Sequence, residues 1–295
     1  MYHTRCIIMG MNLLSLLLYL LFAPVVGGLL AGADRIVTAR MQGRVGPPIL
    51  QPFYDVGKLY EKEQITVNKV QDFYVFCFLL FVVITGGFFF VGGDLLLAIF
   101  VLTLASAFLI VAGYCAGSPY AEIGAERELL QVMAYEPMVL MTAVGFYMFT
   151  GSFRVEDILQ AETMPFLYLI GIFLGFTGIL TIKFRKSPFD LSMSHHAHQE
   201  LVQGLQTEFS GKTLAMIEIA HWYENVFLLG LVFLFFVNGT AWSVALGVGV
   251  ALLTYFIEVF VDNNYARMKW EVTLKVGWFT AITVGFVNLL VLNFI

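Results

Sequence analysis

Eight long runs of apolar residues divide the chain, and this pattern constrains its fold more than any other feature. A helix needs about 20 mostly apolar residues to cross a membrane, because each residue rises about 1.5 Å and the hydrocarbon core is about 30 Å thick. The sequence predicts spans at Cys6–Ala33, Phe73–Gly93, Leu95–Ala121, Leu129–Phe153, Thr163–Ile182, a helix beginning near Thr213, Ala241–Val261 and Val276–Ile295. We therefore expect an all-α integral membrane protein with about eight transmembrane helices, forming a single membrane domain over residues 1–295.

The composition agrees with this fold class. Hydrophobic residues make up 59% of the chain and charged residues 13%, with a mean hydropathy of +0.84. Soluble domains have about 45–50% apolar and about 25% charged residues, so a water-soluble enzyme is excluded. The net charge of -5 argues against a partner nucleic acid.

Lysine and arginine residues gather in one set of loops, which predicts the orientation of the chain. Of the 16 basic residues, only Arg5 and Arg154 fall in the opposite set. Cytoplasmic loops carry the excess of basic residues. We therefore expect a multi-pass protein of a prokaryotic plasma membrane with both termini outside. The cytoplasmic-side segments would be 34–72, 122–128, 183–212 and 262–275, and this face would dock partner proteins.

Segment 42–63 predicts an amphipathic helix on the cytoplasmic side. After a Gly-Pro-Pro turn, Phe53 and Val56 fall on one face and Asp55 and Lys58 on another. Two interpretations remain open. The helix either lies at the membrane interface or acts as a lid that seals against a partner.

Ionisable residues inside predicted spans are the main functional candidates, because a charge in the membrane is costly unless it is paired or hydrated. Glu136 precedes Pro137, which removes a backbone hydrogen bond and loosens the turn before it. Glu218, His221 and Glu224 form one stripe on a later helix. The stripe suggests a proton path. The alternatives are a Glu136 paired with a neighbouring helix and a stripe whose first turns lie at the interface.

Three histidines, His195, His196 and His198, lie within four residues of the longest loop. No cysteine is nearby and no further ligand is evident, so we predict no metal site in this chain. Hydrogen-bonding or proton-carrying roles and a solvated or partner-facing loop remain open. Cys6, Cys77 and Cys115 lie far apart without a Cys-x-x-Cys motif, so no iron–sulfur cluster is expected. We identify no catalytic and no cofactor-binding residue.

Several linked motifs resemble one family of membrane subunits, found in respiratory complex I and in its hydrogenase relatives. These motifs are Arg-Val-Gly-Pro at 44–47, Arg-x3-Gln-x3-Tyr-Glu at 127–136, Pro-Phe-Asp-Leu at 188–191, and Glu-Leu-Val at 200–202 through Glu-Phe-Ser-Gly at 208–211. The resemblance covers nearly the whole chain. It implies a module between a redox arm and a membrane ion pump.

The resemblance also implies roles for particular residues. A proton or ion pathway would comprise Glu136, Glu200, Glu208, Glu218, His221 and Glu224. The redox-arm interface and cavity would comprise Arg44, Asp55, Lys58, Arg127, Tyr135, Asp190, His195, His196 and His198. The basic residues Arg44, Lys58 and Arg127 would balance the charge of the acids.

Two departures from the quinone-using members point to a different branch of the family. The histidine loop replaces an acidic Glu-Ala-Glu stretch, and His221 stands where those members carry a glutamate. The segments 124–128, 195–202 and 220–224 resemble the Ech-type energy-converting hydrogenases. In that branch electrons pass from reduced ferredoxin through iron–sulfur clusters to protons, and no quinone is needed.

We therefore expect a membrane anchor and coupling subunit of an Ech-type nickel–iron (NiFe) hydrogenase. The NiFe centre and the iron–sulfur clusters would belong to partner subunits. Those partners would be the hydrogenase large and small subunits, an iron–sulfur subunit and an antiporter-like membrane subunit, with ferredoxin acting indirectly. The alternatives are a quinone-site subunit of a complex I-type oxidoreductase and a passive membrane anchor of a formate hydrogenlyase-like complex. The moved ion, H⁺ or Na⁺, and the physiological direction stay open.

Overall fold

The computed structural model describes residues 2–65, 68–186, 188–190, 192–193 and 201–294, with the backbone alone for residues 2–12. This part of the chain is helical and contains no β-strand. The helices are α1 (Tyr2–Met41), α2 (Gln51–Glu61), α3 (Lys69–Phe90), α4 (Leu95–Tyr114), α5 (Pro119–Thr150), α6 (Val155–Leu159), α7 (Ile170–Lys183), α8 (Gly211–Leu234), α9 (Ala241–Asn264), α10 (Trp270–Thr280) and α11 (Val287–Phe294).

Within the described residues, seven helices are long and apolar enough to cross a membrane. They are α1, α3, α4, α5, α8, α9 and the continuous rod of α10 and α11, which a π-helical stretch at Ala281–Phe286 joins. Large apolar side chains such as Leu21, Phe76 and Phe279 are exposed on their outer faces. Lipid would cover such side chains, so the structure confirms an all-α membrane protein.

One predicted span is wrong in its first half. The apolar run Thr163–Ile182 predicts one full-length helix, but α7 has only 14 residues and begins at Ile170. A short 3-10 turn at Pro165–Leu167 precedes it. Proline lacks a backbone N–H and favours a helix start over a helix interior. At about 1.5 Å per residue, α7 is about 21 Å long and is shorter than the hydrocarbon core.

Helix α5 begins ten residues before the predicted Leu129, at Pro119. The stretch 122–128, predicted as a cytoplasmic-side segment, is helical and forms part of the first turns of α5. Proline at the first position is compatible with a helix start, and charged residues do not interrupt backbone hydrogen bonding. Consequently Glu136 lies near the middle of a 32-residue helix.

The amphipathic helix predicted after the Gly-Pro-Pro turn is confirmed as α2. Val56 is buried, and the Phe53 ring lies 5.1 Å from the ring of Trp222 on α8. Asp55 is half-buried and Lys58 is exposed. The apolar face of α2 therefore packs on the membrane helices.

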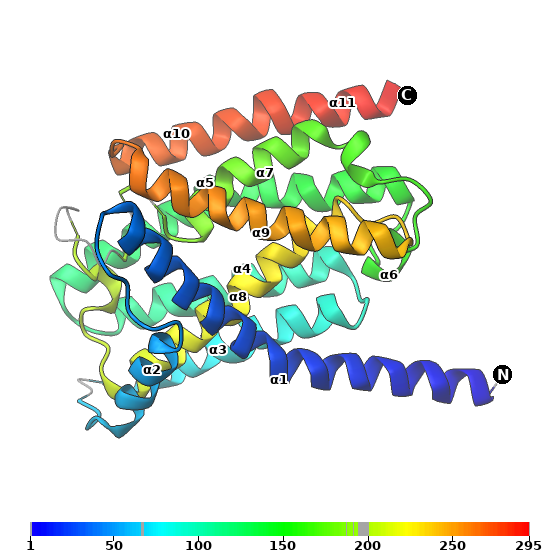
Figure 1. Ribbon diagram of the computed structural model, residues 1–295. Coiled ribbons are helices and arrows are strands. Elements are labelled where there is room, and N and C mark those ends of the chain that lie inside the picture. Colours follow the sequence, from blue (N-terminus) through cyan, green and yellow to red (C-terminus); the bar gives the residue numbers. More distant parts are fainter. Residues whose placement is uncertain (1, 66–67, 187, 191, 194–200, 295) are drawn as a thin grey trace.

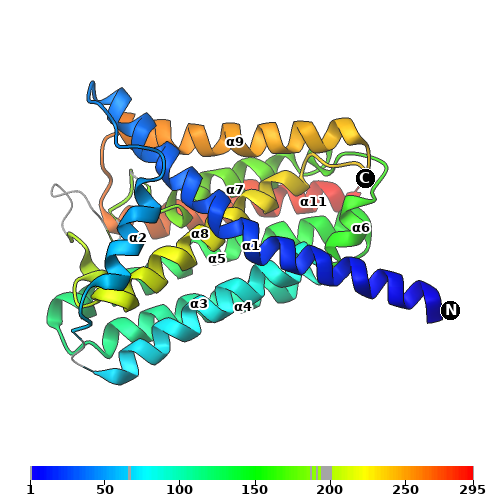
Figure 2. The ribbon, with the colours of Figure 1, turned by 60° about the horizontal axis from the view of Figure 1, so that its bottom comes forward.

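Helix α8 passes through the interior of the bundle, with the α3–α4 pair on one side and the α10–α11 rod on the other (Figure 1, Figure 2). The two termini lie at the same end of the bundle, and α2 lies at the opposite end (Figure 1). Helices α1 and α8 approach closely at Gly27, where an added Cβ would meet the carbonyl oxygen of Trp222 at 2.5 Å. Small residues allow membrane helices to pack at this distance.

Candidate functional site: a buried charge network

A buried ion pair joins the end of α7 to α8. Lys183 Nζ lies 3.1 Å from Glu224 Oε1, and the two side chains are only 4% and 3% exposed. Arg185 Nη1 reaches the other carboxylate oxygen of Glu224 at 3.4 Å. Removing charges from water is expensive, and this arrangement offsets the cost by pairing the one carboxylate with two cations.

Arg185 lies two residues after α7 in an unusual backbone conformation, and its side chain contacts α8. Arg185 has φ +56°, a left-handed conformation that few residues with a side chain adopt. Burial alone lowers the pKa of Arg185, but the carboxylates of Glu224 and Glu128 outweigh it and hold that pKa above its usual value. The guanidinium therefore stays charged inside the protein.

Arg185 also fixes the tautomer of His221. Its Nη1 lies 3.0 Å from Nδ1 of the imidazole. Arginine can only donate hydrogen bonds, so Nδ1 must accept and the ring proton must be on Nε2. That Nε2 is buried and has no hydrogen-bond partner within the described part of the chain. His221 is therefore held as a neutral ring whose Nε2–H is free to donate a hydrogen bond.

A second buried acid completes the network on α5. Glu128 Oε1 lies 3.6 Å from Arg185 Nη2, and its other oxygen accepts a hydrogen bond from the Ser192 hydroxyl. The network thus contains two cations and two carboxylates. Both Arg185 and Ser192 belong to the long segment between α7 and α8, so this segment contacts the buried charges directly.

Tyr135 continues the polar contacts toward the middle of the membrane. Lys183 Nζ lies 4.1 Å from the centre of the Tyr135 ring, and the Tyr135 hydroxyl lies 3.5 Å from Ser106 Oγ on α4. The next residue, Glu136, accepts a hydrogen bond of 2.5 Å from the hydroxyl of Thr103, also on α4. Polar contacts therefore run from Glu224 through Lys183 to Tyr135 and Ser106. Glu136 follows Tyr135 in the chain and makes a separate contact with α4.

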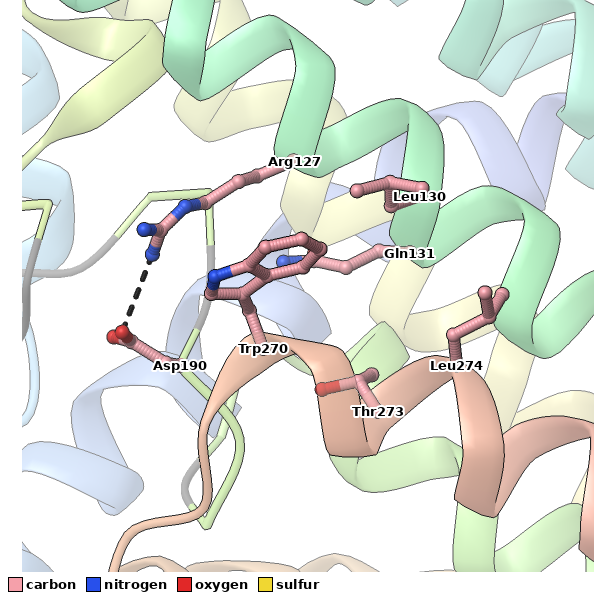
Figure 3. A pocket seen from close by; sticks show the side chains of 7 residues that line it. All are labelled: Arg127, Leu130, Gln131, Asp190, Trp270, Thr273 and Leu274. Carbon is pink, nitrogen blue, oxygen red and sulfur yellow. Dashed lines mark hydrogen bonds and ion pairs between the residues drawn. The ribbon is translucent and has the colours of Figure 1, made fainter.

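A separate contact ties the segment after α7 to α5 and α10. Arg127 Nη1 lies 3.2 Å from Asp190 Oδ2, and the guanidinium stands 5.9 Å from the Trp270 ring (Figure 3). These side chains line a small pocket together with Gln131 and Thr273. The structure thus brings together two residues that the family resemblance assigned to the redox-arm interface.

Asp55 and Arg44, two further residues assigned to the interface, make contacts outside the network. Asp55 pairs with Arg35 on α1 at 2.5 Å, whereas the exposed Arg44 donates a hydrogen bond to Gln42. Partial burial works to raise the pKa of the Asp55 carboxyl, but hydrogen bonds from Arg35 and Gln51 outweigh it and lower that pKa. The cation that pairs directly with Asp55 is therefore Arg35, which the sequence did not indicate, and Lys58 acts on the same carboxyl from farther away.

Two further candidates of the pathway are half-buried, Glu208 between α7 and α8 and Glu218 one turn before His221. His195, His196, His198 and Glu200 lie outside the described residues. Within those residues, no group of three or more His, Cys, Asp or Glu side chains is arranged to hold a metal ion.

Sequence reasoning missed three members of the network: Glu128, Lys183 and Arg185. Each lies just outside a charge-free run. The sequence pattern therefore predicts a charged residue in an exposed loop. Their position at the very end of an apolar run, opposite a helix that carries Glu224, was the available signal.

Comparisons with known proteins show that this chain is similar to membrane subunits of complex I-like and hydrogenase-type complexes. The family described as NADH dehydrogenase matches residues 13–293. Hydrogenase-4 component C of Escherichia coli is 28% identical, over 85% of this chain and 86% of that protein. The H subunit of the NADH-quinone oxidoreductase of Bacillus cytotoxicus is 27% identical, over 94% and 91%.

A solved structure shows the same fold. A chain of the membrane-bound sulfane sulfur reductase, an archaeal respiratory membrane complex, superposes with a TM-score of 0.83 and 25% identity. The match covers 95% of this chain and 99% of that chain.

Proposed function

The chain belongs to the NADH dehydrogenase family, and from that premise we propose that it is the membrane coupling subunit of an Ech-type NiFe hydrogenase. It is a membrane subunit of the kind found in complex I-like and hydrogenase-type oxidoreductase complexes. In the proposed role, electrons pass from reduced ferredoxin to protons on partner subunits. This chain links that reaction to the movement of H⁺ or Na⁺.

The observation that carries the proposal is the buried network around Arg185. One guanidinium contacts Glu128, His221 and Glu224, and it belongs to the segment between α7 and α8. Ionisable groups at membrane depth are retained at a cost and usually mark proton or ion pathways. A passive anchor would have no need for such a cluster.

The geometry supports a simple coupling step. Electrons that arrive on a partner bound at segment 183–212 add negative charge near this segment. Arg185 then moves toward the added charge and away from Glu224. Lys183 is left as the cation that pairs with Glu224. The Glu136 carboxylate, held by the Thr103 hydroxyl, would then take up a proton from water. The resulting carboxylic acid would return this proton to water when Arg185 moves back. Tyr135, which contacts Lys183, is the chain neighbour of Glu136.

The proposed partners follow from the same arrangement. The hydrogenase large and small subunits and an iron–sulfur subunit would dock on segments 34–72 and 183–212, with the NiFe centre and the clusters on those subunits. An antiporter-like subunit would contact the helices that carry the acids. The similarity to hydrogenase-4 component C supports this branch.

The similarity to a subunit of an NADH-quinone oxidoreductase favours one second candidate, a quinone-site subunit. Hydrogen evolution by the native complex with reduced ferredoxin and no added quinone tests the choice. Hydrogen without quinone supports the hydrogenase role. A cluster-containing complex that evolves no hydrogen and is blocked by a quinone-competitive inhibitor would overturn it.

A further inference from the structure

A second polar cluster lies away from the network, between α1 and α9. The ammonium of Lys186 donates a hydrogen bond to Asp34 on α1 and lies 3.7 Å from Asp262 Oδ2 on α9. The side chains of Lys186 and Asp262 are 11% exposed, and that of Asp34 is 19% exposed. One ammonium is therefore shared by two largely shielded carboxylates.

Glu258 adds a third carboxyl group to this cluster. It lies four residues before Asp262 on α9, and residues at this spacing share a face of a helix. Glu258 is only 4% exposed. Its Oε2 is buried and accepts no hydrogen bond from the residues that the structure describes.

The contacts between α1 and α9 fix the level of Glu258. The Tyr255 hydroxyl lies 3.5 Å from the Leu30 carbonyl, and the Asn263 amide donates to Thr38 Oγ1 at 3.1 Å. Both helices run in the same direction between these two contacts. Asp34 therefore lies level with the interval on α9 that holds Glu258 and Asp262, and Glu258 is on the membrane side of Asp262.

The charges around Glu258 do not favour a third carboxylate. Lys186, in the segment after α7, and Asp262, on α9, are the charged groups that act on it. Asp34 lies at a similar level on α1 and shares Lys186 with Asp262, and the neutral Tyr255 lies on α9 itself. Arg267 follows in the loop after α9, five residues beyond Asp262. Lys186 is already engaged with two acids, so an ionised Glu258 would be a buried anion with an unpaired oxygen, which is strongly unfavourable.

We propose that Glu258 is a protonated carboxylic acid and that Asp34, Lys186, Glu258 and Asp262 form a proton-exchange site. In the exchange step, the Lys186 ammonium moves toward Glu258, whose O–H bond breaks as it gives its proton to a water molecule, and that water gives a proton to the carboxylate of Asp34. Glu258 becomes a carboxylate and Asp34 a carboxylic acid, so the total charge is unchanged. Asp34, the more exposed acid, then exchanges the proton with water.

Lys186 lies in the same segment as Arg185 and four residues before Asp190. A displacement of this segment would therefore reach the cluster and the network together. Only this link to the redox partner rests on the proposed function. The protonation state of Glu258 can be tested on this chain without any partner, so the two ideas can fail separately.

The test uses infrared spectroscopy of the full chain in lipid nanodiscs. At neutral pH the wild type should show the C=O stretch of a protonated carboxylic acid, with a shift in heavy water. E258Q should lose this band, whereas the matched control E271Q, at an exposed position on α10, should keep it. A wild-type spectrum identical to that of E258Q would overturn the proposal.

The variant D34N provides a second test, which applies even if E258Q does not fold. D34N removes one of the two carboxylates that share Lys186, so the ammonium becomes more available to Glu258. The protonated-acid band at neutral pH should then fall at least several-fold. An unchanged band in D34N would contradict the proposal. Loss of the wild-type band on adding Na⁺ at constant pH would assign the site to a metal cation instead of a proton.

Discussion

Lys183 and Glu224 form an ion pair of 3.1 Å in which each side chain is almost completely buried. Glu224 also accepts a contact from Arg185, whereas Lys183 contacts the face of the Tyr135 ring. The two residues therefore differ in the number of ion pairs that each one makes. Glu224 pairs with two cations, whereas Lys183 pairs with one oxygen of a single carboxylate.

This asymmetry predicts a ranking of single substitutions. E224Q leaves two cations buried near one another, so it should destabilise the chain more than K183M does. Removal of one partner of a buried pair costs about 3–5 kcal/mol. Thermal unfolding in detergent measures the order. The double variant K183M/E224Q should be more stable than E224Q, and K275M, at an exposed position, should resemble the wild type. A K183M that is less stable than E224Q would contradict this account.

The contact between Arg185 and His221 predicts one tautomer. Nitrogen-15 NMR of histidine-labelled protein should show a neutral His221 ring with its proton on Nε2 at neutral pH, since Nδ1 accepts from a guanidinium at 3.0 Å. In R185Q the amide can also accept, so the ring is no longer restricted and the Nδ1-protonated form should appear. A charged ring, or the same spectrum for both proteins, would show that Arg185 does not set the tautomer.

The Arg127–Asp190 pair predicts a defect in assembly. D190N removes the charge that holds the segment after α7 against α5, so less of the partner subunits should copurify with the chain. The membrane content of the chain itself should change little. E156Q, on the exposed surface of α6, is the matched control. Full copurification with D190N would mean that this pair does not position the docking segment.

The lowered pKa of Asp55 predicts that the local stability of α2 depends on pH in the acid range. The pKa of Asp55 is lowered in the folded chain because Arg35 and Gln51 outweigh the effect of partial burial. A lowered folded-state pKa contributes stability above the unfolded value of about 3.9, and this contribution is lost as the pH falls through the folded value. The protection of the α2 amides, measured against their intrinsic exchange rate at each pH, should therefore fall below about pH 4 in the wild type. D55N should exchange faster at neutral pH and respond less to acid, and an equal response would remove Asp55 as the cause.

Much of the fold could be predicted because the signals are local. Apolar length located most spans, and the spacing of Phe53 and Val56 located α2. The start of α5 was missed because the charges at 122–128 ended the apolar run while the backbone hydrogen bonding continued. The short α7 was missed because Pro165 changes the local backbone without changing hydropathy.

The site was predicted only in part because its contacts are not local. Tyr135, Glu136, His221 and Glu224 could be selected as polar residues within apolar helices. Their partners Lys183 and Arg185 lie about 40 residues before Glu224, at the end of another helix. Only the three-dimensional packing of α7 against α8 shows that these charges are buried together.

The most direct test measures ion transport and hydrogen evolution together in E136Q. The native complex and the variant are reconstituted in proteoliposomes with reduced ferredoxin, and a pH-sensitive and a Na⁺-sensitive dye report transport. The account predicts that E136Q assembles and evolves hydrogen but transports at least tenfold fewer ions per hydrogen, because a glutamine amide at this position cannot carry a proton. The conservative variant T103S, which keeps the hydroxyl that contacts Glu136, should retain transport. Unchanged transport in E136Q would contradict the central claim.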